Sequence, residues 1–171
     1  MRQIIGPMAL ALVLISGVSN TYAEPLKIDM RLSNPQQARI DFPLVGAEKH
    51  FAFYVKRTGA VAAGSTWAGA KAEEVGLHDV FPGDRVWGTG YITLTLPNGD
   101  QVSMKHEFVA AFLPTAGGQM AAVDHGFWTI IGGTGSLSGI RGVGRFQFKL
   151  APDDPNARVW ELTGDIAVVS K

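Results

Sequence analysis

Short stretches of alternating apolar and polar residues, separated by Gly, Pro, Asn and Asp, follow one another along most of the chain. This alternation is typical of β-strands, because successive side chains of a strand point to opposite faces. Strands at such regular spacing predict an all-β domain, and eight of them suit a small closed antiparallel β-barrel, which leaves no sheet edge unpaired. The eight expected strands are residues 26–32, 49–57, 72–80, 86–96, 100–112, 120–131, 141–150 and 158–169.

The N-terminal segment has a different pattern. Arg2 precedes an apolar run from Met8 to Ile15, and small and polar residues then lead to Ala23. The run is shorter than the roughly 20 residues that span a bilayer, so it predicts a secretory signal peptide rather than a membrane span; the alternative is a buried N-terminal element. We therefore expect a signal peptide over residues 1–23, a single β-barrel domain over residues 24–171, and a secreted or periplasmic location.

Charge and cysteine content exclude several classes of function. Removal of residues 1–23 takes away Arg2 alone among the charged residues and leaves a net charge of −1. Nucleic-acid surfaces need clustered basic charge, so we expect no nucleic-acid partner. The chain has no cysteine, which excludes disulfides, a thiol nucleophile and Cys-ligated zinc or iron–sulfur sites. The remaining 148 residues are enough for one domain with its own hydrophobic core.

The turn "LPNGD", Leu96 to Asp100, sets the register of one hairpin. A type I turn centred on Pro97 and Asn98, with Gly99 left-handed, pairs Leu96 with Asp100. A two-residue turn would shift the pairing by one residue and mix apolar with polar side chains on both faces. The first register separates them and places on the interior face Val86, Gly88, Gly90, Ile92, Leu94, Val102, Met104, His106, Phe108 and Ala110.

The two faces of this hairpin carry different candidates for function. His106 is the one ionisable group of the interior face, and it lies opposite glycines, which leave space beside it. It is either a hydrogen-bonded core histidine or a side chain that faces a ligand. The outer face carries Trp87, Tyr91, Val109 and Ala111, which indicate a subunit contact or are scattered surface residues.

The segment "IIGGTGSLSG", residues 130–139, has the strand and glycines of a dinucleotide-binding motif. Such a motif needs a helix after the glycines, but Arg145 to Leu150 alternate as a strand does. Only 32 residues follow Gly139, and the glycine spacing is one residue longer than in G-x-G-x-x-G. We therefore expect no NAD(P) and no other cofactor.

The longer segment Gly126 to Phe148, "GFWTIIGGTGSLSGIRGVGRFQF", resembles the signature of the allene oxide cyclase/dirigent barrel superfamily, which bacterial proteins of unknown function share. The pattern G-G-T-G-x-[FL]-x-G-[AIL]-x-G lies here over residues 132–142. The resemblance implies that the glycines form a tight turn at one end of the barrel, which Leu137 closes. Plant members cyclise a fatty-acid epoxide or guide radical coupling of phenols, and they form dimers or trimers. The resemblance therefore implies a small apolar ligand and a homo-oligomer.

Candidate site residues come from the strand pattern, because no local motif transfers the plant enzymes' functional positions. His50 and Tyr54 share one face of a strand, as do Glu74 and His78. Asp124 and its neighbour His125 point to opposite faces. The candidates for orienting or polarising a ligand are His106, Tyr54 and Asp124. The candidates for contacting it are Gly88, Gly90, Met104, His106, Phe108, His50 and His78.

Other chemistries have little support in the sequence. Glu74 and His78 lie four residues apart, which separates them by about 13 Å along a strand. The chain has no H-x-H pair, no HExxH and no G-x-S-x-G elbow. We therefore predict no metal site, unless side chains distant in sequence assemble one, and no Ser-His-Asp hydrolase.

Two functions remain open. The first is a secreted barrel that binds a small apolar molecule and, if it is an enzyme, isomerises or cyclises that molecule mainly by positioning it. The second is a non-catalytic binding or interaction protein of the periplasm or cell exterior. The superfamily motif and the glycines opposite His106 favour the first function. The lack of a catalytic constellation and the aromatic outer face favour the second.

Overall fold

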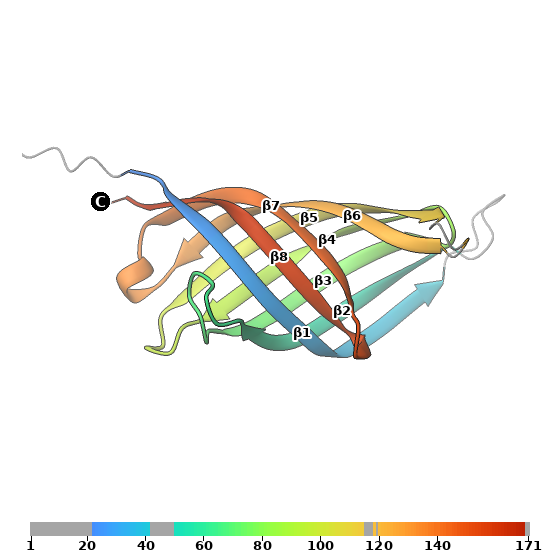
Figure 1. The fold of residues 1–171 in the computed structure, drawn as a ribbon, viewed down its shortest axis with the longest axis horizontal. Coiled ribbons are helices and arrows are strands. Elements are labelled where there is room, and N and C mark those ends of the chain that lie inside the picture. The colour runs from blue at the N-terminus through green and yellow to red at the C-terminus, as the bar shows by residue number, and fades with distance from the viewer. Residues whose placement is uncertain (1–21, 42–49, 115–117, 119, 170–171) are drawn as a thin grey trace, which may run out of the picture.

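The computed structural model describes residues 22–41, 50–114, 118 and 120–169, and it is a closed barrel of eight antiparallel strands (Figure 1). Each strand pairs with the next along the chain, and β8 pairs with β1. The predicted all-β architecture is confirmed. The strands are β1 Glu24–Asp41, β2 Phe51–Val61, β3 Lys71–Phe81, β4 Arg85–Thr95, β5 Gln101–Pro114, β6 Met120–Gly133, β7 Ile140–Ala151 and β8 Asp154–Val168, with a 3₁₀ helix η1 Gly135–Leu137.

β1 is longer than its predicted range of 26–32. Its first part pairs with β8 and its second part with β2, and the register against β2 shifts between Ser33 and Gln36. The prediction ended early because "SNPQQAR" is polar and contains a proline, which argues against a strand interior. The irregularity in the pairing accommodates this segment, so β1 continues to Asp41.

The β4–β5 hairpin has the register that its turn predicts. Gly90 pairs with His106, and Gly88 pairs with Phe108. Gly99 has a φ of 90° and donates its N–H to the carbonyl of Leu96 at 2.9 Å. The side chains of the predicted interior face are buried, except Val86, which is half-buried.

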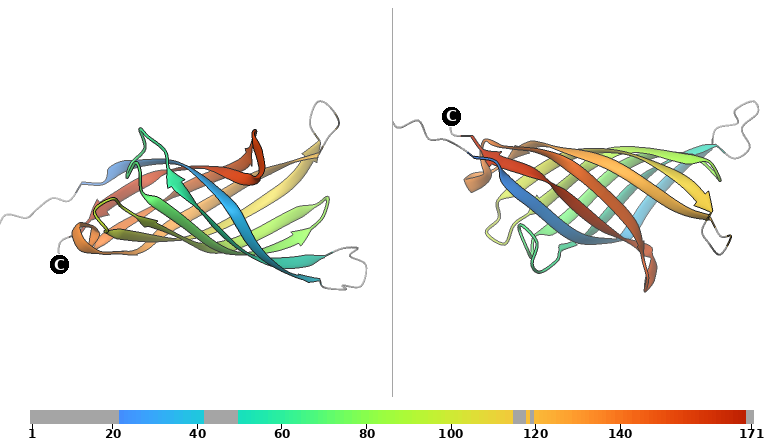
Figure 2. Two further views of the ribbon diagram at one scale, coloured as in Figure 1. Left: turned by 90° about the horizontal axis from the view of Figure 1, so that it is seen from below. Right: turned by 45° about the horizontal axis from the view of Figure 1, so that its top comes forward.

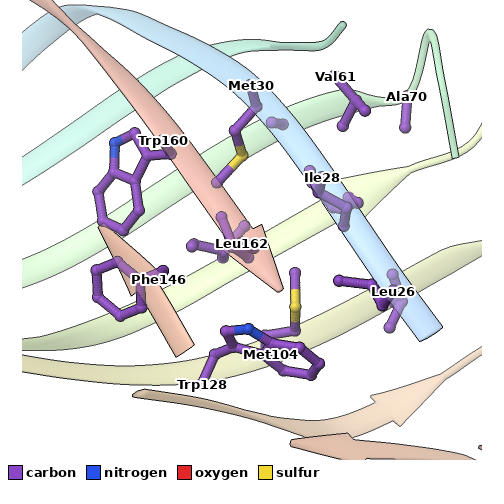
Figure 3. Close-up of a cluster of buried hydrophobic side chains, with 14 of the residues drawn as sticks. Leu26, Ile28, Met30, Val61, Ala70, Met104, Trp128, Phe146, Trp160 and Leu162 are labelled. Atoms are coloured by element: carbon purple, nitrogen blue, oxygen red, sulfur yellow. The ribbon is translucent and has the colours of Figure 1, made fainter. Parts of the chain in front are cut away.

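Apolar side chains from both chain ends fill much of the barrel interior. Leu26, Ile28 and Met30 of β1 pack with Leu162 of β8 and with Trp128 of β6 (Figure 3). All of these side chains are at most 2% exposed. A barrel of eight strands is narrow enough for side chains to fill in this way.

The glycine-rich segment forms the tight turn that the resemblance implies. Gly135 has a φ of 55°, and Leu137 is buried at 9% exposure. The carboxylate of Asp100, in the β4–β5 turn, accepts hydrogen bonds from the N–H of Ser136 at 2.9 Å and from its hydroxyl at 2.5 Å. The motif therefore joins two neighbouring turns at one end of the barrel, shown from two further sides in Figure 2.

The ladder between β6 and β7 is the shortest in the barrel. It contains four residue pairs, from Gly126–Phe146 to Thr129–Val143. Beyond the first pair, the carboxylate of Asp124 accepts the backbone N–H of Phe148 at 2.9 Å. A side chain thus replaces a backbone acceptor at this point. We call this short ladder the β6–β7 seam.

Candidate functional site

Four polar side chains meet inside the barrel: Arg57 of β2, Glu74 and His78 of β3, and His106 of β5. None is more than 5% exposed. Strand alternation points them inward, because Glu74, Gly76 and His78 form the buried face of β3 and Arg57 lies on the face of β2 that also buries Val55. We call these four residues the interior cluster.

One oxygen of Glu74 is paired and the other is not. Arg57 Nη1 donates to Glu74 Oε2 at 2.7 Å. Glu74 Oε1 lies 3.7 Å from His78 Nε2 and 3.9 Å from His106 Nε2, which is too long for direct hydrogen bonds. Among the described residues, Glu74 Oε1, His78 Nε2 and both ring nitrogens of His106 therefore have no hydrogen-bond partner. Buried polar atoms in this state are rare and each needs an explanation.

Glycines bring these atoms together. A Cβ on Gly76 would lie 3.3 Å from Glu74 Oε1 and 3.2 Å from His78 Nε2, and a Cβ on Gly90 would lie 2.7 Å from His106 Nε2. The side chains of Glu74 and His78 therefore approach each other across Gly76. The expectation that spacing along a strand keeps these two side chains apart is wrong, since their polar atoms come within 3.7 Å.

Aromatic rings surround the interior cluster. The ring of His106 lies 5.5 Å from Trp160 and 5.7 Å from Phe146, in edge-on arrangements. The ring of His78 lies 4.8 Å from Phe53 and 5.0 Å from Phe108. Edge-on packing, as in all of these pairs except His78 with Phe53, is favourable for aromatic rings.

The charge states of the cluster follow from burial and proximity. Burial by itself would raise the pKa of Glu74, but its interactions with His78 and Arg57 hold that pKa below the ordinary value. Burial lowers the pKa of His106 to about 4, against the attraction of Glu74. At neutral pH an ionised carboxylate therefore faces a neutral imidazole. Arg158 of β8 is half-buried, and burial together with the charge of Arg57 lowers its pKa.

The glycines of the β4–β5 hairpin make room for rings. A Cβ on Gly88 would lie 1.9 Å from the ring of Phe108, and Gly90 lies against His106. Imidazole and phenyl rings thus occupy the space that the sequence indicated beside His106. Met104, another proposed ligand contact, is fully buried in the apolar core.

His50 and Tyr54 do not lie with the interior cluster. Tyr54 is 42% exposed on the outer wall. His50 precedes β2, stacks on Phe81 with ring centroids 4.2 Å apart, and pairs with the carboxylate of Asp79. Phe81 and Asp79 alternate with the buried Val80 and so belong to the outer face of β3.

Asp124 and His125 point to opposite faces, as their adjacency predicts. Asp124 is 5% exposed, whereas His125 is exposed on the outer wall. Burial raises the pKa of Asp124, although the N–H of Phe148 partly offsets this. The carboxylate of Asp124 is thus committed to the backbone of β7 rather than to the interior cluster.

Arg57 and Arg158 are functional candidates that the sequence alone does not indicate. The signal for Arg57 was present in "FAFYVKR", where it shares the face of Phe53 and Val55. An arginine on an apolar strand face needs a buried acceptor, and Glu74 is the residue directly opposite on β3.

The described part of the chain lacks two further features. No three His, Asp or Glu side chains there are arranged to hold a metal ion. No helix in that part is both long and apolar enough to span a bilayer.

No family model and no curated protein matches the sequence. Among solved structures, the chain is similar to a pterocarpan synthase dirigent protein, with 12% sequence identity and a TM-score of 0.48 over 99% of this chain and 98% of that chain. The closed eight-stranded barrel is the architecture that the sequence resemblance implied. The fold and site define a small antiparallel barrel with a buried ionic cluster among aromatic rings.

Proposed function

We propose that the protein is a barrel that binds a small apolar molecule next to the interior cluster. The observation that carries this proposal is the set of unpartnered polar atoms of Glu74, His78 and His106 among aromatic rings. Each buried polar atom without a partner costs on the order of 1–3 kcal/mol, which a purely structural core would avoid. Convergent polar groups within an apolar lining are typical of ligand sites.

The residues of the site have separate roles in this proposal. Phe53, Phe108 and Phe148 contact the apolar body of the ligand, and His106 and Glu74 hold its polar end. Gly88 and Gly90 leave room for the rings that form the wall, and Met104 and His78 complete the contacts. If the ligand is isomerised, Glu74 is the group placed to accept a proton from it, because it is an ionised carboxylate whose Oε1 has no hydrogen-bond partner.

Ligand binding is tested with an apolar fluorescent probe, 1-anilinonaphthalene-8-sulfonate, and with native mass spectrometry of probe complexes. Phe148→Ala should weaken probe binding about tenfold, because it removes a ring next to Phe108 and Trp160. The matched control is Phe127→Ala, since Phe127 is 62% exposed on the outer wall. A barrel that binds no apolar probe, or equal losses in both variants, would contradict the proposal.

We also propose that residues 1–23 are a secretory signal peptide and that the mature chain is exported. The support is the order of Arg2, the apolar run and Ala23. Expression of the full chain in a bacterium should yield a product whose mass corresponds to a chain that begins at Glu24. A cytoplasmic product that keeps these residues would contradict this location.

A second candidate is an interaction protein that assembles through its outer wall, and one observation favours it. Register places Tyr54 beside Leu77, and Trp87 beside Val109. Tyr91 lies on β4, in the next outward-facing row from Leu77. Each of these five side chains is between 42% and 54% exposed. Contiguous exposed apolar residues of this kind mark protein contacts.

The measurement for this second candidate is the mass in solution, by light scattering after size exclusion. We expect a homo-oligomer, dimer or trimer, that Leu77→Lys dissociates. The control is Val143→Lys, because Val143 is also exposed but lies on β7. A monomeric wild type would count against assembly through this wall.

A further inference from the structure

We infer that Glu74, His78 and His106 form a site for one hydroxyl oxygen, supplied by water in the ligand-free protein and by an alcohol group of the bound ligand. The alcohol part of this inference rests on the proposed ligand-binding function. The water part stands on the geometry of the interior cluster alone.

The distances define a place for a single atom. Glu74 Oε1 lies 3.7 Å from His78 Nε2 and 3.9 Å from His106 Nε2. Each separation exceeds a direct hydrogen bond, but it leaves room for an oxygen atom about 2.8 Å from Glu74 Oε1 and from that histidine nitrogen. We place one such oxygen against all three atoms. Gly76 and Gly90 keep the adjoining wall free of side chains, because a Cβ on either residue would lie within 3.3 Å of these polar atoms.

The donors and acceptors around this place select a hydroxyl. Arg57 occupies Oε2 of Glu74, so that Oε1 is left as an acceptor that needs a donor. The imidazoles of His78 and His106, with hydrogen on Nε2, provide two donors that need an acceptor. A hydroxyl donates one hydrogen bond and accepts two, so one oxygen satisfies all three atoms.

Other polar groups fit this place less well. An ether or a carbonyl oxygen accepts from the imidazoles but leaves Glu74 Oε1 without a donor. A carboxylate would be repelled by the ionised Glu74. An ammonium group would donate to Glu74, but it would lie close to the guanidinium of Arg57 and give the imidazole N–H groups no acceptor.

The first experiment is a high-resolution crystal structure of the ligand-free protein. We expect density for one oxygen within 3.2 Å of Glu74 Oε1, His78 Nε2 and His106 Nε2. A direct hydrogen bond from either histidine to Glu74 Oε1, with no density between them, would overturn the hydroxyl site.

The second experiment compares naphthalen-2-ylmethanol with 2-(methoxymethyl)naphthalene by isothermal titration calorimetry. The two probes share the apolar body, and the methyl ether lacks the hydroxyl donor. We expect wild type to bind the alcohol at least tenfold more tightly than the ether, since the ether leaves a buried carboxylate oxygen unpaired.

Variants of neighbouring glutamates assign this preference to Glu74. In Glu74→Gln, the amide oxygen should face Arg57, and the amide NH₂ should replace the acceptor Oε1. The preference for the alcohol should then fall to about twofold or less. Glu73→Gln should keep the wild-type ratio, because Glu73 is an exposed partner of Lys56 on the outer wall. If Glu74→Gln does not fold, the ratio in wild type is still decisive.

The outcomes separate the two proposals. Equal binding of both probes by wild type overturns the alcohol preference and leaves the proposed ligand-binding function intact. Binding of neither probe overturns both the ligand-binding function and the alcohol part, and the crystal density then decides the water part alone.

Discussion

The imidazole of His106 lies directly against the backbone of Gly90, which is its partner in the β4–β5 ladder. A Cβ on Gly90 would come 2.7 Å from His106 Nε2 and 2.3 Å from the carbonyl oxygen of Val75. His106 can therefore keep this position only if residue 90 is glycine. Two adjacent strands and one ring share a space that admits no further carbon atom.

This contact predicts that Gly90→Ala destabilises the fold. The added methyl group must displace His106 or the backbone of β3, and overpacking of this kind costs about 1–3 kcal/mol. Urea unfolding followed by tryptophan fluorescence measures the loss. Gly132→Ala is the control, because its Cβ would meet no atom within 4 Å. Equal losses of unfolding free energy in the two variants would contradict this prediction, because they would show that His106 and its neighbours move aside at no cost.

The buried pair of Arg57 and Glu74 predicts a non-additive pair of substitutions. Arg57→Met leaves a carboxylate buried without its charged partner, and we expect a loss of about 3–5 kcal/mol in the free energy of unfolding. The double variant Arg57→Met/Glu74→Leu should recover most of that loss, because it removes both charges. Chemical denaturation of the two variants and wild type completes the comparison.

The control for this pair is Lys56→Met, which breaks the exposed contact between Lys56 and Glu73 on the outer wall. It should change the free energy of unfolding far less than Arg57→Met, because solvent screens exposed ion pairs. Additive losses in the double variant would contradict the interpretation of a coupled buried pair.

The lowered pKa of His106 predicts how stability depends on pH. The unfolded chain takes up a proton at His106 near pH 6.5, whereas the folded chain does so only near pH 4. Between these values the unfolded state binds more protons, so the free energy of unfolding falls as the pH falls. A shift of this size corresponds to about 3 kcal/mol below pH 4.

The measurement is a series of urea titrations between pH 7 and pH 4. His106→Gln should flatten the dependence in this range, because glutamine does not titrate. His125→Gln should leave the slope of wild type, since His125 is exposed on the outer wall. A slope that survives in His106→Gln would assign the pH dependence to other groups.

The contact between Asp100 and Ser136 predicts a local effect at the η1 turn. Ser136 donates two hydrogen bonds to Asp100, and they hold the pKa of Asp100 below its ordinary value. Asp100→Ala should speed hydrogen exchange of the Ser136 amide at least tenfold, because that N–H loses its acceptor. Asp153→Ala, which removes an exposed partner of Arg31, should leave this exchange rate unchanged.

Residue pattern alone predicts the eight strands, apart from the second part of β1, and the β4–β5 register. A short turn fixes that register, and alternation decides between the two pairings that the turn allows. The meeting of Arg57 with Glu74 could not be predicted in this way. Residues 62–70 connect β2 to β3, and a connection of this length leaves the register of the two strands open.

The approach of His106 to Glu74 could not be predicted from the sequence either. It depends on two strands, β3 and β5, that are separated by β4 and brought toward each other across the barrel interior. Glycines at positions 76 and 90 permit it, and their effect is visible only when the neighbouring side chains are in place.

The β6–β7 seam has a consequence for exchange between the interior and solvent. Four residue pairs join these strands, whereas nine join β1 to β8 and eleven join β4 to β5. Local opening of the barrel should therefore begin between β6 and β7, and not between β1 and β8, where the two ends of the chain meet. Such an opening leaves a curled sheet in which β1 and β8 remain paired and β6 and β7 become the edges. It exposes Trp128 and Phe146 from the side. Water and small ligands would then enter and leave through the wall of the barrel, and the rate of this exchange would follow the rate at which the β6–β7 seam opens.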